Sequence, residues 1–258
     1  MTARDQHGGA QQQVSTALPL LELSDVSVHY GAVVALDHVS VQIYPGEVVS
    51  LMGPNGAGKS TVLKAVMGMA PVSTGTVRWH NDILASPTHE IVKRGISLVP
   101  QGRRVFTHLN VEENLELGGM HVRDAAERSR RLDAVMEFFP ILRQKRRDPA
   151  SAMSGGQQQM LALGRGLMSS PEILLLDEPT LGLAPIIVSE VFQRVTEISK
   201  TFGTTIVLVE HNIRGALSIV DRGYILDKAR VAFEGTPKEI EDSDILTQVF
   251  LGREDNEE

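Results

Sequence analysis

The stretch with the clearest chemistry is Gly53-Pro54-Asn55-Gly56-Ala57-Gly58-Lys59-Ser60-Thr61. Its glycines let the backbone fold closely around phosphate oxygens, where a Cβ atom would collide. Successive backbone N–H groups then form an anion-sized hollow, and the helix that follows adds the positive end of its dipole. The Lys59 ammonium can meet the β- and γ-phosphates, and the Ser60 hydroxyl can bind Mg²⁺. The spacing G-x-x-x-x-G-K-[ST] therefore predicts a site for a nucleoside triphosphate.

The residues on either side of this loop support the same interpretation. Residues 47–52 favour a buried strand, and residues 61–67 favour a helix that ends at Gly68. A strand, a glycine loop and a helix in that order are the context that the motif requires. The alternative, an ordinary glycine-rich turn that happens to precede Lys-Ser, does not explain the motifs farther along the chain.

Composition sets broad limits on function. A chain of 258 residues with 42% hydrophobic residues can bury one α/β core with an inserted subdomain. The net charge of -7 argues against a nucleic-acid partner, and the absence of cysteine excludes disulfides and Cys-ligated metals. Because no apolar run approaches the roughly 18 residues that cross a bilayer, we expect a cytoplasmic protein that meets the membrane only through a partner.

The first third of the chain predicts a polar tail followed by a sheet. Residues 1–18 are rich in Gln and Gly, and we expect them to be disordered. Short β-like runs over 21–43 and 75–79 predict an antiparallel sheet laid against the nucleotide core. Tyr30 comes just before Gly31 in this sheet, where an exposed ring could stack on adenine. A half-buried strand tyrosine is the alternative that spacing alone favours.

The middle of the chain, from about 104 to 170, predicts mainly helices. Leu132, Val135, Met136 and Phe139 recur at helical spacing and predict one buried face. A second motif, Ser154-Gly155-Gly156-Gln157, opens another helical stretch. Ser154 can act simply as an N-cap, or the glycines and the helix N-terminus can together face a phosphate.

Polar residues follow three predicted strands where each strand ends. Asp177 and Glu178 follow an apolar run typical of a central parallel strand, His211 follows a β-branched run, and Gln101 follows residues 96–100. The first carboxylate can hold Mg²⁺ through its hydration shell. Glu178 is then available to orient or deprotonate a water, and His211 could contact that water or the γ-phosphate.

Taken together, these motifs resemble those of the ATP-binding cassette (ABC) ATPases over residues 20–252. The resemblance implies one ABC ATPase domain over 19–252, before an acidic tail at 253–258. It also implies an α/β fold: a P-loop NTPase (RecA-like) core with an antiparallel β subdomain and an inserted α-helical subdomain. It makes Gln101, Glu178 and His211 the catalytic set and Ser60, Gln101 and Asp177 the metal site. ATP would be held by Tyr30, by Gly53, Pro54, Asn55, Gly56, Ala57, Gly58, Lys59, Ser60 and Thr61, and by Ser154, Gly155, Gly156 and Gln157 of a second subunit packed head to tail.

Other runs resemble the shorter ATPase (LivF-like) of high-affinity branched-chain amino-acid importers; they are residues 99–106, 111–115, 181–185 and 221–224. That resemblance implies a second ABC ATPase subunit in a homo- or heterodimer, two membrane permeases, an extracytoplasmic binding protein, and a place on the cytoplasmic face of the plasma membrane. Met153 replaces the usual signature leucine, and Ala184 replaces the usual aspartate after Gly-Leu. Gln101 and His211 are both retained, which favours a complete catalytic set.

Three other functions are alternatives to an importer of branched-chain amino acids. The ATPases of urea and short-chain amide importers have the same sequence motifs. A non-transport soluble ABC ATPase would need a long coiled coil, a second cassette or a basic stripe, and the sequence has none of these. A simple kinase would lack Ser154–Gln157. Within the importer hypothesis, we expect residues 102–117 to line a groove for a permease helix with Phe106 as its apolar anchor; a core position for Phe106 is the alternative.

Overall fold

A computed structural model describes residues 18–250, and its first sheet is antiparallel. The predicted tails, residues 1–18 apart from Leu18 and residues 253–258, lie outside this range. The sheet has the strand order β2-β1-β4-β5, and both neighbours of β1 run antiparallel to it. Its strands are β1 (Leu21–Tyr30), β2 (Val33–Ile43), β4 (Val72–Trp79) and β5 (Asp82–Ile83). The antiparallel sheet expected from the sequence is therefore confirmed.

The second sheet forms the core, with the order β10-β9-β3-β8-β7-β6. Neighbours from β9 to β6 are parallel, so their carboxyl ends lie at one edge, whereas β10 is antiparallel to β9. The polar residues that follow β6, β7 and β8 therefore meet at this edge, as the sequence predicts. The strands are β3 (Val48–Met52), β6 (Ile96–Val99), β7 (Ile173–Asp177), β8 (Thr205–Val209), β9 (Arg222–Asp227) and β10 (Arg230–Gly235).

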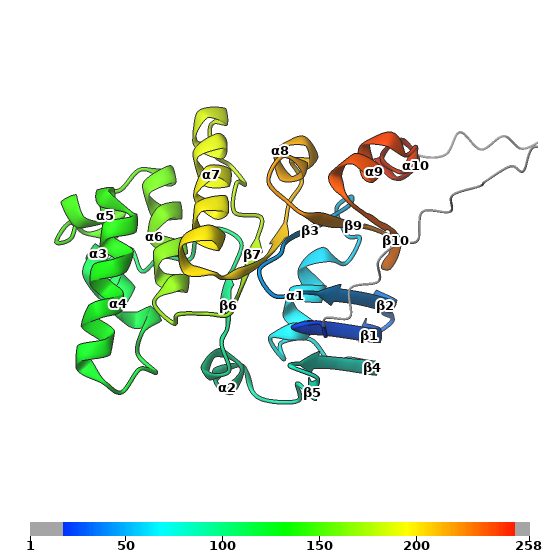
Figure 1. The fold of residues 1–258 in the computed structure, drawn as a ribbon, viewed down its shortest axis with the longest axis horizontal. Coiled ribbons are helices and arrows are strands. Elements are labelled where there is room, and N and C mark those ends of the chain that lie inside the picture. Colours follow the sequence, from blue (N-terminus) through cyan, green and yellow to red (C-terminus); the bar gives the residue numbers. More distant parts are fainter. Residues whose placement is uncertain (1–17, 251–258) are drawn as a thin grey trace, which may run out of the picture.

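Both faces of the core sheet are covered, and side chains alternate between them. On β7, Leu174 and Leu176 join the cluster under the helices, while Ile173 and Leu175 join the cluster under the antiparallel sheet. This two-sided burial explains the unbroken apolar run in the sequence. Figure 1 shows the antiparallel sheet with α1 (Lys59–Val66) and α2 (Thr88–Lys93) on one side of the core sheet. The helices on the other side include α7 (Pro185–Phe202), α8 (Ile213–Leu217), α9 (Pro237–Asp242) and α10 (Ile245–Phe250).

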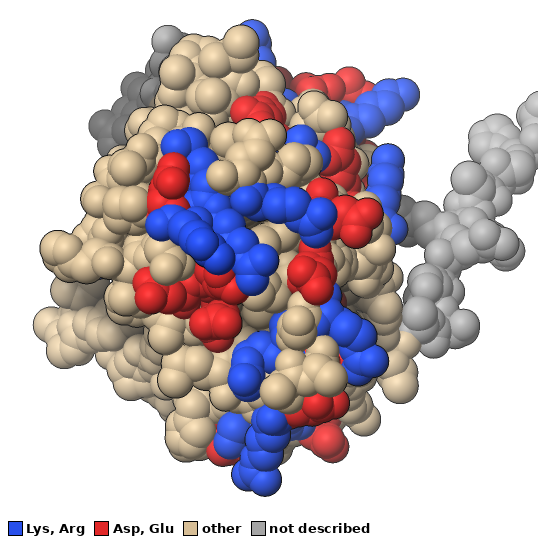
Figure 2. All heavy atoms as spheres, turned by 90° about the vertical axis from the view of Figure 1, so that its left-hand side faces the viewer, with Lys and Arg blue, Asp and Glu red and all other residues tan. Residues whose placement is uncertain are grey.

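Four α-helices between β6 and β7 pack together beside the core sheet (Figure 1): α3 (Val111–Gly118), α4 (Ala125–Phe138), α5 (Pro140–Gln144) and α6 (Gly155–Leu167). The predicted apolar face is buried, although Phe139 follows the last residue of α4 rather than lying within it. Figure 2 shows basic and acidic residues intermixed on the outer face of these helices. No helix within residues 18–250 is long and apolar enough to cross a membrane.

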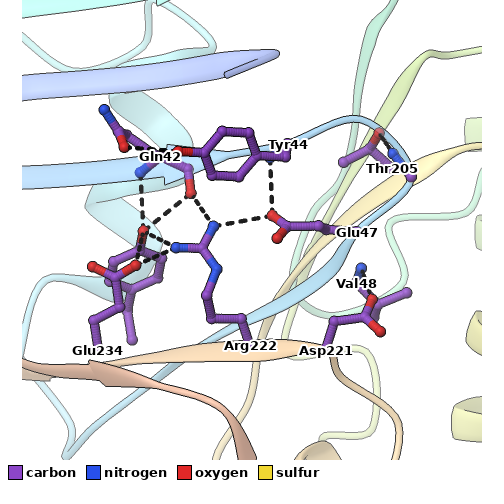
Figure 3. A network of polar contacts seen from close by, with 10 residues as sticks. Gln42, Tyr44, Glu47, Val48, Thr205, Asp221, Arg222 and Glu234 are labelled. Carbon is purple, nitrogen blue, oxygen red and sulfur yellow. Dashed lines mark hydrogen bonds and ion pairs between the residues drawn. The ribbon is translucent and has the colours of Figure 1, made fainter. Parts of the chain in front are cut away.

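A polar cluster joins the two sheets near the first residue of β3 (Figure 3). Arg222 lies between Glu47 and Glu234 and forms an ion pair with each carboxylate. The buried Tyr224 hydroxyl accepts from Gln42 N at 3.1 Å and donates to Gln42 O at 3.0 Å. Since Gln42 lies on β2 and Arg222 on β9, this Arg222 network fastens the antiparallel sheet to the core sheet.

Candidate functional site

The loop between β3 and α1 has the compact backbone expected of a phosphate cradle. Gly53 has φ 145°, and a Cβ atom there would lie 2.1 Å from the Leu226 carbonyl oxygen, so only glycine fits. The buried Lys59 side chain folds back over the loop, with Nζ donating to Gly53 O at 2.8 Å and Pro54 O at 2.9 Å. Burial lowers the pKa of the Lys59 ammonium, and the nearby Glu178 and Asp177 carboxylates partly offset this. The hydrogen bonds of the ammonium among the described residues therefore go to these two carbonyl oxygens.

Two predicted metal ligands come together beside the loop. Ser60, in the first turn of α1, donates to Asp177 Oδ1 at the end of β7, and the oxygens are 2.7 Å apart. Burial raises the pKa of Asp177, and the Ser60 hydrogen bond opposes this change. A hydroxyl and one carboxylate are oxygen ligands that suit Mg²⁺, which keeps waters and substrate phosphates as its remaining ligands. The described residues contain no cluster of three or more His, Asp or Glu side chains that could hold a metal by themselves.

Glu178 lies between the other two predicted catalytic residues. Its Oε2 accepts from Gln101 Nε2 at 2.6 Å, and its Oε1 lies 2.7 Å from His211 Nε2. Glu178 also has φ 49°, a left-handed conformation that is uncommon for a residue with a side chain. The structure therefore joins the ends of β6, β7 and β8 through one carboxylate held in a strained turn.

Tyr30 lies at the end of β1, and 44% of its surface is exposed. A contact between this ring and adenine stays a prediction. The hairpin that carries Tyr30 also reaches the phosphate loop, because a Cβ atom on Gly58 would lie 2.6 Å from the Ala35 carbonyl oxygen. An aromatic ring is thus available to solvent on a hairpin that packs against the loop.

Ser154 and Gln157 form a capping box at the start of α6. Gln157 N donates to Ser154 Oγ at 3.3 Å, and Ser154 N donates to Gln157 Oε1 at 3.0 Å. The N-cap expected from the sequence is therefore present. Ser154 is exposed, and within residues 18–250 no hydrogen bond or ion pair links residues 154–157 to residues 53–61. In a single chain, this helix start and the phosphate loop are separate surfaces.

Sequence reasoning assigned no role to Glu210, which the structure buries between two loops of the site. Its carboxylate accepts from Thr180 on one side and from the His211 backbone on the other. The available signal was an acidic residue directly after a buried strand, the same signal that selected Asp177. Ala184 is the N-cap of α7, and its side chain makes no capping hydrogen bond there. An aspartate at this position could accept such a bond from the backbone of the first turn.

The family model for ABC transporters matches residues 36–181, which include the phosphate loop, the α6 cap and Glu178. The chain belongs to the ABC transporter family. It is 42% identical to the high-affinity branched-chain amino acid transport ATP-binding protein BraG of Pseudomonas aeruginosa. That match extends over 234 residues, which are 90% of this chain and 100% of the relative.

Solved structures of ABC cassettes have the same fold. A nucleotide-free ATP-binding cassette from an ABC transporter matches with a TM-score of 0.82 at 25% identity, covering 92% of this chain and all of that one. A dimeric post-hydrolysis cassette bound to ADP and Pi matches with a TM-score of 0.74 at 28% identity, covering 84% and 98%. The predicted α/β fold is confirmed, and the chain is an ATP-binding ABC subunit with ATPase activity.

Proposed function

We propose that this chain is the ATPase subunit of an importer for branched-chain amino acids, working at a head-to-tail dimer interface. Its resemblance to BraG supports the cargo. The observation that carries the dimer is the separation of the exposed Ser154 cap from the phosphate loop, since no hydrogen bond or ion pair within residues 18–250 links the two. The ADP-bound relative is itself dimeric. Residues 19–252 would form the single ATPase domain, with residues 104–170 as its inserted helical subdomain.

The catalytic residues divide the work at the end of the core sheet. Glu178, with Gln101 and His211 on its two oxygens, orients the attacking water and accepts its proton. His211 holds the carboxylate in place, and its side chain is exposed enough to reach the γ-phosphate. Lys59 leaves its loop carbonyls for the phosphates, the residues of 53–61 donate their backbone N–H groups, and Tyr30 stacks on the adenine. The residues 154–157 close the site from the other subunit.

Ser60, Asp177 and the Gln101 amide oxygen are the groups that would hold Mg²⁺. When bound, Mg²⁺ supplies charge neutralisation at the β- and γ-phosphate oxygens. Burial disfavours the charged form of Asp177 and raises its pKa, and no Lys or Arg within residues 18–250 forms an ion pair with it. A divalent cation would therefore provide the positive charge that this carboxylate lacks.

The groove beside residues 102–117 is the proposed seat of a permease helix. It encloses about 570 Å³ between the core and the helical segment, and its exposed apolar residues are Met69, Phe106 and Met120. Phe106 is 53% exposed, which leaves an apolar ring available to such a helix. Phe106→Ala should retain the melting temperature and isolated ATPase activity but lose transport in the assembled complex. Loss of isolated activity together with early melting would contradict this role.

The partners follow from the same proposal: a second ABC ATPase subunit, two membrane permeases and an extracytoplasmic binding protein, with the chain on the cytoplasmic face of the plasma membrane. Cells lacking this chain should lose uptake of labelled leucine, isoleucine and valine, and the wild-type gene should restore it. Uptake of labelled urea and acetamide is measured in the same cells. If only urea or amide uptake disappears, the amino-acid cargo is wrong while the ATPase assignment stands.

A further inference from the structure

Glu210 is a buried carboxylate that directly follows β8 and lies between two loops of the catalytic site. Only 2% of its surface is exposed. Its Oε1 accepts from Thr180 N at 3.0 Å and from Thr180 Oγ1 at 2.6 Å. Its Oε2 accepts from His211 N at 3.1 Å and from Asn212 N at 3.3 Å. One carboxylate oxygen thus accepts from the loop that holds Thr180, and the other accepts from the loop that holds His211 and Asn212.

The four donors explain how a carboxylate can be buried there without a cation. No Lys, Arg or His side chain of residues 18–250 forms an ion pair with Glu210. Three backbone N–H groups and one hydroxyl instead satisfy both oxygens, and a buried carboxylate requires such donors. A neutral side chain that merely filled the space would leave several of these donors without an acceptor.

The two loops joined by Glu210 are those that carry Glu178 and His211. Thr180 comes two residues after Glu178, whose backbone has the strained φ of 49°, and His211 itself donates to Glu210. The 2.7 Å contact between Glu178 Oε1 and His211 Nε2 spans the same two loops. Glu210 therefore forms hydrogen bonds with the backbones of both loops whose side chains, Glu178 and His211, are in contact.

We propose that Glu210 is a positioning residue for hydrolysis, which holds the Glu178 turn and the His211 turn at the separation that the attacking water requires. This inference rests on the roles proposed above for Glu178 and His211. The side-chain hydrogen bonds of Glu210 go to Thr180, His211 and Asn212 rather than to residues 53–61, so its effect should fall on turnover rather than on ATP binding.

The test is Glu210→Gln in the purified full-length chain. A glutamine has the same shape, but its NH₂ group cannot accept and must face donors on one side. We expect kcat to fall on the order of 10–10²-fold, as for a small misplacement of a catalytic group, while the KM for ATP stays within about two-fold. A kcat within about two-fold of the wild type would overturn the proposal.

A second variant separates positioning from general loss of stability. Thr205→Val removes a buried acceptor at the other end of the same strand, where Thr205 Oγ1 accepts from Gly46 N at 2.9 Å. It should lower the melting temperature, as we expect of Glu210→Gln, but leave kcat unchanged at temperatures below melting.

Should Glu210→Gln not fold, Thr180→Val offers a milder test, because it removes only the hydroxyl donor to Glu210. It should lower kcat, and Thr180→Ser, which keeps the hydroxyl, should recover most of that loss; equal rates in the two would contradict the proposal.

A double variant tests whether Glu210 acts through Glu178. In single-turnover measurements on Glu178→Gln, adding Glu210→Gln should change the residual rate less than about two-fold, because residues that act as a unit are not additive. A full additional loss would show an independent effect and overturn the inference. If Glu178→Gln alone hydrolyses ATP normally, the proposed catalytic role fails first; if it is inactive while Glu210→Gln is normal, only the positioning role fails.

Discussion

The two ends of the core sheet both hold carboxylates, but they satisfy them differently. Where β3 and β9 begin, Glu47 and Glu234 form ion pairs with Arg222 (Figure 3). Where β7 ends, Asp177 and Glu178 have no Lys or Arg ion-pair partner within residues 18–250; a hydroxyl, an amide and an imidazole contact them instead. At one end the chain supplies a cation that pairs with both carboxylates, and at the other no Lys or Arg of the described residues forms such a pair.

The difference separates a structural joint from a reactive site. A buried charge that is paired and hydrogen-bonded has little to gain from another ligand, whereas buried carboxylates without a cation favour the binding of one. Glu178, at the reactive end, also has φ 49°, which is uncommon for a residue with a side chain. Substitutions at the end of β7 should therefore change turnover, and substitutions in the Arg222 network should change stability.

The largest effect is expected for Glu178→Gln. Removing the group proposed to orient and deprotonate water should cut ATP turnover by about 10²–10⁴-fold while ATP still binds. Glu47→Gln at the opposite end is the matched control, because it makes the same chemical change in an ion pair with Arg222. It should retain turnover. Steady-state ATPase rates and ATP titrations measure both, and normal turnover in Glu178→Gln would transfer the role to His211.

The next largest effect is a loss of ATP affinity on substitution of Lys59, whose ammonium donates to the carbonyl oxygens of the phosphate loop. Lys59→Ala should weaken ATP binding by about 2–5 kcal/mol, since it removes a partly desolvated charge from the β- and γ-phosphates. Lys64, five residues farther along α1, is exposed and serves as the control for loss of a lysine from this helix. Calorimetric titration with ATP distinguishes the two variants. Unchanged affinity in Lys59→Ala would contradict the phosphate-loop assignment.

At the other end, Arg222→Met should destabilise the fold without a specific loss of turnover. It leaves Glu47 and Glu234 without their cation, and breaking such a pair costs about 2–4 kcal/mol when, as here, one carboxylate is half exposed. Denaturant unfolding measures the loss. At temperatures where the variant remains folded, its kcat should match the wild type, and a selective fall in kcat would break the division between the two ends.

The sequence predicted the reactive end better than the structural one. Loop glycines, Lys59 and the residues that end β6, β7 and β8 are recognisable because parallel strands bring their carboxyl ends to one edge. Glu210 was not assigned because its importance depends on Thr180, 30 residues away along the chain. The Arg222 network was not found for the same reason: Gln42 and Tyr224 are 182 residues apart, and no local pattern marks their contact.

The smallest predicted effect is a change of stability at high pH that depends on Tyr224. Burial raises the pKa of Tyr224 to about 12, compared with about 10 for an ordinary tyrosine. Between these values the unfolded chain has lost the phenolic proton and the folded chain has kept it. The unfolded state then binds fewer protons, so the stability contributed below pH 10 is lost as pH rises toward 12, by about 2–3 kcal/mol in total.

Urea unfolding of the wild type and Tyr224→Phe between pH 8 and about 11 isolates this contribution, because every other group titrates in both proteins. Below about pH 9 the two free energies of unfolding should differ by a constant amount, which is the cost of the lost hydroxyl in the Arg222 network. Above about pH 10 the wild type should lose stability faster by up to about 1.4 kcal/mol per pH unit. Parallel curves throughout would mean that the Tyr224 hydroxyl is not held as a proton donor to Gln42 O or Glu234, and the structural end of the sheet would then lack its central hydrogen bond.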